Sequence, residues 1–238
     1  MHNFTNKEIL NWRAFLELKQ QLSKDKRLKN FYSQGTYHDE TPIRDVEFVA
    51  LDFETTGLDA AKNSIISIGL VHFNLRRIFC KKSKSWYIDP QDNLQEDSIV
   101  IHGITHSDLK SAPNLLRILE QLLDELAGKV IVVHYRRIER DFLDSNLRAF
   151  IKEGIVFPMI DTMQIEADIQ HQKSLGFFNW FKNKKSHSIR LANSRTRYNL
   201  PTYQPHDAVT DAIATAELFQ AQIKHHFSPE TELKKLWL

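Results

Sequence analysis

The feature of this sequence that most restricts its fold is an apolar run ending in two carboxylates placed one residue apart. Residues 47–53 are rich in Phe, Val, Ala and Leu, which predicts a buried β-strand, and Asp52 and Glu54 stand at its end. Side chains two apart on a strand point to the same face, so these carboxylates repel each other and are costly to bury unless cations pair them. Mg²⁺ and Mn²⁺ favour such oxygen ligands. An isolated Asp-x-Glu is most often a solvated strand end, so the interpretation depends on the rest of the chain.

A second acidic position lies far along the chain, in a predicted helix over residues 206–226. Pro205 and the periodic small and apolar residues after it indicate the helix start, with His206 at the entrance and Asp211 about one turn inside. A histidine at a helix entrance is usually solvated or acts as a cap. An Asp near the apolar side of a helix is unfavourable without a partner, which favours a functional role for Asp211.

A third element lies between these two regions. The apolar run 130–134 predicts a short strand that ends at His134, and the following residues predict a turn into a helix over 138–152. The order Asp-x-Glu, then His-x₄-acid-x₂-Phe-Leu, then His-x₄-Asp-Ala resembles the DEDDh (DnaQ-like) 3′→5′ exonuclease family. The likeness covers roughly residues 46–223. Further segments follow the family's order and approximate spacing: 101–105, 112–113, 160–162 and 198–201.

The chain departs from the family pattern in its second motif. The family usually has His-Asn-x-x-Phe-Asp there, whereas this chain has Tyr135 in place of the Asn and Glu139 in place of the Asp. Asp141 competes for the same role. Two residues two positions apart on a helix point about 200° apart, so both acids cannot face one metal pair. The register that aligns Phe142 with the family assigns the role to Glu139.

The resemblance implies a two-metal phosphodiesterase site. Two Mg²⁺ or Mn²⁺ ions about 4 Å apart would activate a water and stabilise the departing 3′-oxygen. Asp52 would bridge both ions, Glu54 and Asp211 would complete the ion that holds the nucleophilic water, and Glu139 would act at the second ion. By the same resemblance, Glu54 would also serve as a catalytic residue. His206 would take the proton from the attacking water, because an imidazole titrates near neutral pH.

The resemblance also implies contacts with the 3′ end of the substrate. The backbone of Thr55 would meet the terminal 3′-hydroxyl, and Leu58 would wedge beside the last base. Asp97 and His102 match positions that contact the terminal nucleotide. Simple packing for Leu58 and a solvated surface acid for Asp97 are equally good interpretations.

The predicted fold is an α/β domain with a ribonuclease H-like mixed sheet flanked by helices and preceded by a helical extension. Apolar positions among residues 6–30 predict one or two amphipathic helices. We divide the chain into an extension and link (1–45), an exonuclease domain (46–227) and a short tail (228–238). Besides the elements above, the pattern predicts strands at 65–73 and 76–88, a helix at 113–127 and a short apolar run near 156–160.

Composition limits the class and the compartment. The 238 residues lack any apolar stretch approaching the ~18 residues of a membrane span, and the polar start predicts no signal peptide. Cys80 is the single cysteine, which excludes an intramolecular disulfide and a Cys-ligated zinc site and fits a reducing cytoplasm.

The net charge is only +2, but basic residues are concentrated late in the chain. Residues 169–206 contain no Asp or Glu, and Lys182, Lys184 and Lys185 follow a group of four aromatic residues within 177–181. This composition is typical of a platform for single-stranded nucleic acid, and equally of a surface loop whose aromatic side chains enter the core.

The sequence therefore predicts a metal-dependent 3′→5′ exonuclease acting on a single-stranded or frayed 3′ end, with DNA favoured, and releasing nucleoside 5′-monophosphates. The expected partners are a nucleic-acid strand and a polymerase or repair protein. The alternative is a degenerate family member that binds nucleic acid or a polymerase without cleaving, suggested by the changes at Tyr135 and Glu139.

Overall fold

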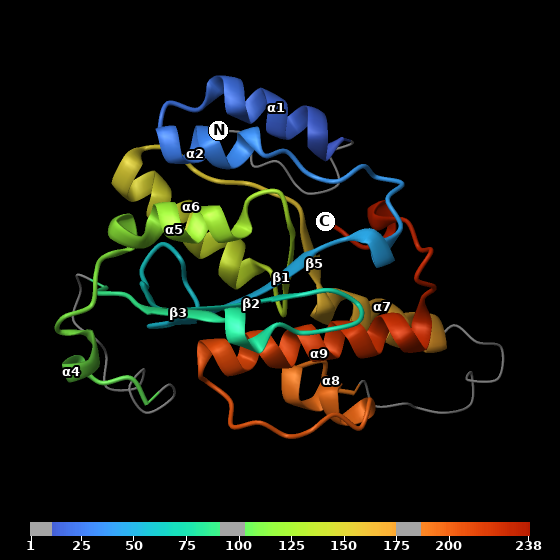
Figure 1. Ribbon diagram of the computed structural model, residues 1–238. Coiled ribbons are helices and arrows are strands. Elements are labelled where there is room, and N and C mark those ends of the chain that lie inside the picture. Colours follow the sequence, from blue (N-terminus) through green and yellow to red (C-terminus); the bar gives the residue numbers. More distant parts are fainter. Residues whose placement is uncertain (1–10, 91–102, 175–186) are drawn as a thin grey trace.

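The computed structural model describes residues 11–90, 103–174 and 187–238, and these form a five-stranded mixed sheet covered by helices (Figure 1). The sheet order is β3-β2-β1-β4-β5, so β1 is central. It pairs antiparallel with β2 and parallel with β4. The strands are β1 (Phe48–Thr55), β2 (Ile65–Phe73), β3 (Lys84–Tyr87), β4 (Val130–Val133) and β5 (Met159–Asp161).

The helices lie on both faces of the sheet. In Figure 1, α5 and α6 lie on one side with α1 and α2 beyond them, and α7, α8 and α9 lie on the other. The helices are α1 (Trp12–Leu22), α2 (Lys26–Ser33), α4 (His106–Leu109), α5 (Leu115–Leu126), α6 (Arg137–Ile151), α7 (Thr162–Ser174), α8 (Leu191–Arg197) and α9 (Ala208–His226). Short 3₁₀ turns are η2 (Ile43–Asp45), η3 (Cys80–Lys82) and η4 (Leu233–Lys235).

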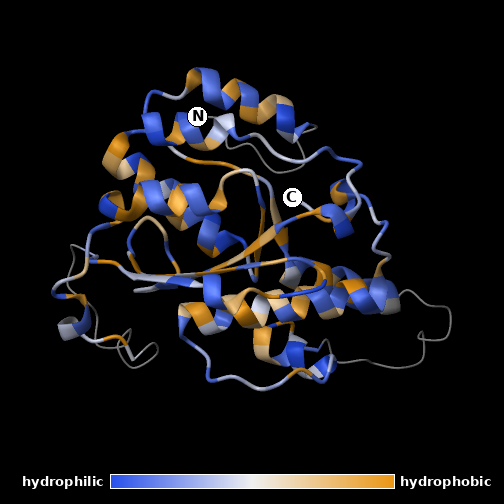
Figure 2. Ribbon diagram, in the orientation of Figure 1, coloured by the Kyte–Doolittle hydropathy of each residue, from blue (hydrophilic) through white to orange (hydrophobic). Residues whose placement is uncertain are grey.

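The side chains of β1 alternate between two hydrophobic clusters. Val49 and Leu51 pack with the apolar sides of α5 and α6, whereas Phe48 and Ala50 pack with α9. Because strand side chains alternate, Asp52 and Glu54 lie on the same face as Ala50, toward α9. Figure 2 shows the apolar residues gathered on the strands and on helix surfaces that face them.

The predicted extension and tail both contact this sheet domain. Leu16 of α1 and Leu28 of α2 belong to the same buried cluster as β1 and α5. The tail extends the sheet edge, because Trp237 forms a bridge with Ile160 and the Leu238 N–H donates to the Met159 carbonyl at 2.8 Å. The domain boundaries at residues 45 and 227 stay predictions.

Two parts of the predicted element order differ from the structure. The run 76–88 is a strand only over β3, because the chain first makes the turn η3. The helices α4, α7 and α8 were not predicted. The α7 sequence has no clear apolar stripe, and its start depends on Asp161, which accepts the N–H of Met163 at 2.9 Å. This capping bond satisfies a helix-end donor that periodicity does not reveal.

Candidate functional site

The site is centred on the end of β1. The Glu54 side chain is buried, and the pairing of β1 with β2 shifts register between Glu54 and Thr55. Such an irregularity bends a strand and redirects its side chains, and it is common beside active sites. Burial, together with the carboxylates of Glu139, Glu54 and Asp211, raises the pKa of Asp52 well above its usual value. The carboxylates of the site therefore bring together more negative charge than the neighbouring protein groups stabilise.

The first turn of α9 brings two further functional groups to β1. The Asp207 side chain caps the helix by accepting the Thr210 N–H at 2.8 Å, and Asp211 accepts the His206 N–H at 2.8 Å. His206 is exposed and has a positive φ of 72°. Potential ligand atoms of Glu54, His206 and Asp211 all lie within 4.8 Å of one another. Residues distant in sequence thus converge at one point.

The first turn of α6 supplies Glu139 and turns Asp141 away. Glu139 is 1% exposed, and its Oε2 atom has no hydrogen-bond partner among the described residues. Burial raises the pKa of Glu139 well above its usual value, and the charges of Asp161 and Glu54 act in the same direction. The Asp141 side chain is 51% exposed and lies 3.9 Å from Arg137. Glu139 is therefore the acid of α6 that belongs to the acidic cluster.

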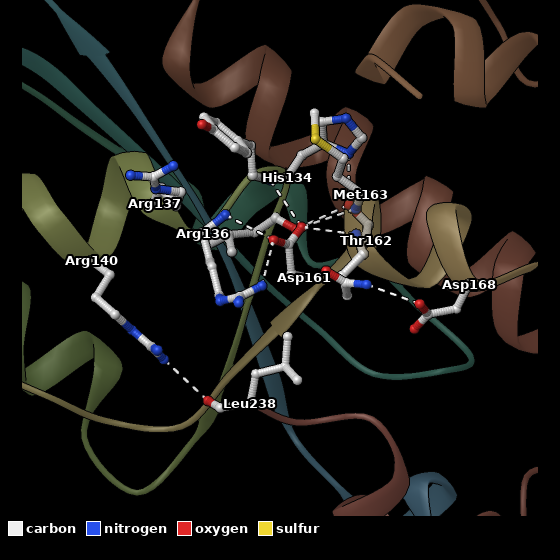
Figure 3. Close-up of polar contacts among 12 residues, drawn as sticks. His134, Arg136, Arg137, Arg140, Asp161, Thr162, Met163, Asp168 and Leu238 are labelled. Carbon is white, nitrogen blue, oxygen red and sulfur yellow. Dashed lines mark hydrogen bonds and ion pairs between the residues drawn. The ribbon is translucent and has the colours of Figure 1, made fainter. Parts of the chain in front are cut away.

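Asp161, at the end of β5, holds the turn that precedes Glu139 (Figure 3). It accepts the N–H of Tyr135 and the N–H of Arg136, each at 3.0 Å. Tyr135 has a φ of 81°, a left-handed conformation that costs energy for a residue with a Cβ. The two hydrogen bonds compensate for this strain and orient the start of α6. The sequence signal for this role was Asp161 itself, an acid directly after a predicted apolar run.

His134, the residue after β4, contacts Thr162 at the start of α7 (Figure 3). Its Nδ1 lies 2.8 Å from the Thr162 hydroxyl, and its Nε2 donates to the Ile189 carbonyl at 3.1 Å. Burial lowers the pKa of His134 to about 4, so the ring is neutral at pH 7. Its contacts tie β4 to α7 and to the segment before α8, which is a structural arrangement.

The residues expected to contact substrate are only partly described. The Thr55 hydroxyl donates to the Gly57 carbonyl at 2.7 Å. Leu58 is 84% exposed. Asp97 and His102 lie outside the described residues. The same holds for the three lysines of the basic segment, Lys182, Lys184 and Lys185.

The donor set fits a hard divalent cation. All four acids offer carboxylate oxygens, and the unpaired Glu139 Oε2 is a buried acceptor that lacks a positive partner among the described residues. The raised pKa values of Asp52, Glu139 and Asp211 show that burial and mutual repulsion outweigh what neighbouring donors provide. Divalent ions with oxygen preference would remove this deficit.

Comparison with known proteins identifies the family. The family model described as the RNase T-type exonuclease matches residues 49–219. The chain belongs to this exonuclease family. Its resemblance to the DEDDh exonucleases is confirmed, and the protein is assigned as an exonuclease, a hydrolase of phosphodiester bonds. The acidic cluster fits the divalent metals that this family uses.

The exonuclease has relatives among replication proteins. It is 29% identical over 181 residues to the DNA polymerase III subunit epsilon of Treponema pallidum, covering 76% of this chain and 78% of the relative. It is 28% identical to the PolC-type DNA polymerase III of Halalkalibacterium halodurans, covering 77% of this chain but 12% of that protein. The chain thus matches only a small part of the PolC-type relatives.

Solved exonucleases share the fold. The nuclease domain of 3′hExo, a DEDDh family member bound to rAMP, superposes with a TM-score of 0.60 at 15% identity and covers 76% of this chain and 92% of that one. Exonuclease X, solved with duplex DNA carrying a 5′ overhang, gives 0.55 at 18% identity, with coverages of 79% and 97%. The predicted ribonuclease H-like fold is confirmed. Within the described residues, no helix is long and apolar enough to cross a membrane.

Gly69 sets how closely α9 approaches the acids of β1. Gly69 pairs with Asp52 across the β1–β2 ladder, and a Cβ on Gly69 would lie 2.2 Å from the Ala208 carbonyl carbon. We expect Gly69→Ala to push the first turn of α9 outward, and with it Asp211, so that turnover falls. The free energy of unfolding should also fall by about 1–3 kcal/mol, as overpacking does. Urea denaturation measures this loss.

Gly35 provides the control for Gly69→Ala. A Cβ there meets nothing within 4 Å, although the φ of 62° is unfavourable for other residues. Gly35→Ala is expected to cost about 1 kcal/mol through backbone strain alone and to leave hydrolysis unchanged. Equal turnover in the Gly69→Ala and Gly35→Ala variants would mean that α9 does not need this close approach.

Proposed function

We propose that this exonuclease removes nucleoside 5′-monophosphates from the 3′ end of a single-stranded or frayed nucleic acid, with DNA preferred, and uses two Mg²⁺ or Mn²⁺ ions. The observation that carries the proposal is the convergence of carboxylates from β1, α6 and α9 with a histidine at the edge of the cluster. The names of the relatives, which are subunits or parts of DNA polymerases, support DNA as the substrate.

In the proposed mechanism Asp52, Glu54, Glu139 and Asp211 would hold the divalent ions. Such ions neutralise the charge on the phosphate and lower the pKa of bound water. His206 accepts a proton from the attacking water on its imidazole ring. Its exposed position leaves room for substrate to enter first, and the bond from its N–H to Asp211 holds its backbone beside the carboxylates.

We also propose how the 3′ end is held. The backbone of Thr55 binds the terminal 3′-hydroxyl, a role proposed from its motif position directly after Glu54. Leu58 packs beside the last base, which the high exposure of its side chain supports. Asp97 and His102 contact the terminal nucleotide, a role proposed from their motif positions. A DNA polymerase is the proposed protein partner, suggested by the names of the relatives.

A time course on labelled strands tests the direction of degradation. With Mg²⁺ present, single-stranded DNA labelled at its 5′ end is expected to shorten stepwise, whereas a 3′ label is released at once as the 5′-monophosphate. RNA of the same sequence, run in parallel, tests the preference for DNA. Immediate release of the 5′ label would contradict the proposed polarity. Tight binding without any shortening would instead favour the degenerate, non-cleaving alternative that Tyr135 and Glu139 suggest.

The unusual second motif gives a separate expectation. Glu139→Ala should lower turnover at least about a hundredfold, the scale seen when a group that positions catalytic charge is lost. Asp141→Ala is the matched control on the same helix, and it should cost less than about threefold, because Asp141 is exposed and faces Arg137. Single-turnover rates on a short DNA strand provide the measurement.

The conservative change at the same position sharpens this comparison. Glu139→Asp restores the residue that the family prefers and should retain activity, with an altered preference between Mg²⁺ and Mn²⁺ because the carboxylate is one methylene shorter. If Asp141→Ala proved the more damaging change, the role assigned to Glu139 would belong to Asp141 instead.

A further inference from the structure

The segment between α8 and α9, residues 198–207, carries His206 to the site. Most of its side chains are exposed, and Tyr203 is one of the few that is not. At its far end, the His206 N–H bonds Asp211 and Asp207 caps α9. What holds the part of the segment before His206 is therefore decisive for where the imidazole rests.

Arg195, in α8, provides this anchor. Its residue is 4% exposed, and its guanidinium donates to the Pro201 carbonyl at 2.8 Å and to the Ala214 carbonyl of α9 at 2.6 Å. It also donates to Glu217 Oε2 at 2.7 Å. The planar, many-donor guanidinium suits a site where several acceptors converge, which a single ammonium does not.

Tyr203 completes the arrangement. The guanidinium carbon of Arg195 lies 4.6 Å from the centre of the Tyr203 ring, and the Tyr203 hydroxyl donates to Glu217 Oε1 at 2.9 Å. Arg195, Tyr203 and Glu217 therefore form one unit, called here the Arg195 clamp. It ties the segment to α9, the helix that carries Asp211. On the segment, Tyr203 lies three residues before His206. On α9, Ala214 and Glu217 lie about one turn and two turns beyond Asp211.

We propose that the Arg195 clamp is a positioning device for His206, so that Arg195 governs how often the imidazole occupies its working place. This inference rests on the proposed role of His206 as the proton acceptor. Arg195 touches neither substrate nor reacting atoms in this assignment. A displaced catalytic group lowers turnover steeply, and a misplacement of about 1 Å can cost about a hundredfold.

If the clamp positions His206, removing it should lower kcat only because His206 is displaced. Arg195→Met keeps an unbranched side chain but removes every donor, and we expect kcat to fall about tenfold to a hundredfold. The dissociation constant for Mn²⁺ should stay within about threefold, because the acids lie on β1, α6 and α9 and not on the released segment. Arg195→Lys should recover part of the loss, since one ammonium serves fewer acceptors.

A double-mutant cycle separates this role from a general loss of structure. In the His206→Ala background, Arg195→Met is expected to change kcat by less than about twofold, because the group it positions is already absent. Multiplicative losses in the double variant would overturn the clamp. So would a parallel fall in Mn²⁺ affinity, or normal kcat in Arg195→Met.

Arg197 offers a matched control on the same helix. Its Nε lies 2.9 Å from the buried Glu166 of α7, so this arginine ties α8 to α7 instead of to the segment that carries His206. Arg197→Met should lower the melting temperature, and any kcat loss should be the same in both backgrounds. If Arg195→Met did not fold, Tyr203→Phe would replace it in the cycle, because it removes only the hydroxyl that bonds Glu217.

The cycle also distinguishes failure of the clamp from failure of the proposed mechanism. Near-normal kcat in His206→Ala alone would show that His206 is not the proton acceptor, and the proposal that Arg195 positions it would then have no basis. A strongly slowed His206→Ala variant combined with multiplicative losses would leave the mechanism intact and overturn only the role of Arg195.

Discussion

In excess EDTA, hydrolysis by this exonuclease is expected to fall below detection and to return when Mg²⁺ or Mn²⁺ is added beyond the chelator. The reason is electrostatic. Attack on a phosphodiester adds charge to an anionic centre, and the site itself gathers four carboxylates. Asp52→Asn should be almost as damaging, because Asp52 interacts electrostatically with the other three acids and would hold the divalent metal together with them. Initial rates on a labelled DNA strand measure both effects.

The same acids give the metal-free protein a defined pH dependence. Asp52, Glu139 and Asp211 have raised pKa values when folded, so the folded state binds more protons than the unfolded chain. Their contribution to stability is present below the unfolded pKa values, near 4, and is lost as pH rises through the folded ones. His134 acts oppositely: its pKa of about 4 adds stability as pH rises toward 6.5.

Above about pH 6.5 His134 is neutral in both the folded and the unfolded state, so only the acids contribute. The melting temperature without metal should therefore fall as pH rises through the raised folded pKa values of these acids. Saturating Mg²⁺ should raise it, and more at pH 8 than at pH 5.5, where ions must displace protons. Thermal melts with Mg²⁺ and with EDTA give the measurement. Robust hydrolysis in EDTA, or equal Mg²⁺ shifts at both pH values, would contradict a site built from these acids.

The site residues that could be predicted from the sequence are those whose position follows from the pattern of neighbouring residues. Asp52 and Glu54 end an apolar strand, and Asp211 lies one turn into a periodic helix. These patterns follow from strand alternation and helix period, which neighbouring residues determine. The mixed sheet flanked by helices was an expectation from the family resemblance, and the structure has this arrangement.

The parts that sequence reasoning missed depend on contacts between distant residues. Gly69 matters because α9 lies against it, and Arg195 because Pro201, Ala214 and Glu217 converge on one guanidinium. Asp161 compensates for the left-handed backbone at Tyr135 through hydrogen bonds across 26 positions. Side-chain capping and close backbone approach leave no periodic trace in a sequence, so α7 and α8 were missed for the same reason.

His206→Ala is expected to lower turnover by about two to four orders of magnitude, the contribution of a well-placed general base. Binding of Mn²⁺ should remain nearly intact, because the carboxylates on β1, on α6 and on α9 itself supply the ligands. His225→Ala is the control, since His225 is exposed at the opposite end of the same helix and should leave turnover unchanged. Rates are measured under single-turnover conditions, and Mn²⁺ affinity by calorimetry.

The metal measurement decides between two roles for this histidine. Potential ligand atoms of His206 lie within 4.8 Å of those of Glu54 and Asp211, so the imidazole is also placed to bind an ion directly. The φ of 72° and the exposure of His206 favour a residue that approaches the site from outside, with the acids below it holding the metal. If His206 is the general base, its removal lowers the rate and leaves Mn²⁺ affinity intact. If His206 is a metal ligand, its removal lowers the rate and the Mn²⁺ affinity together. If Mn²⁺ affinity fell in His206→Ala as far as in Asp52→Ala, His206 would be a metal ligand, and the proton acceptor would have to be another group.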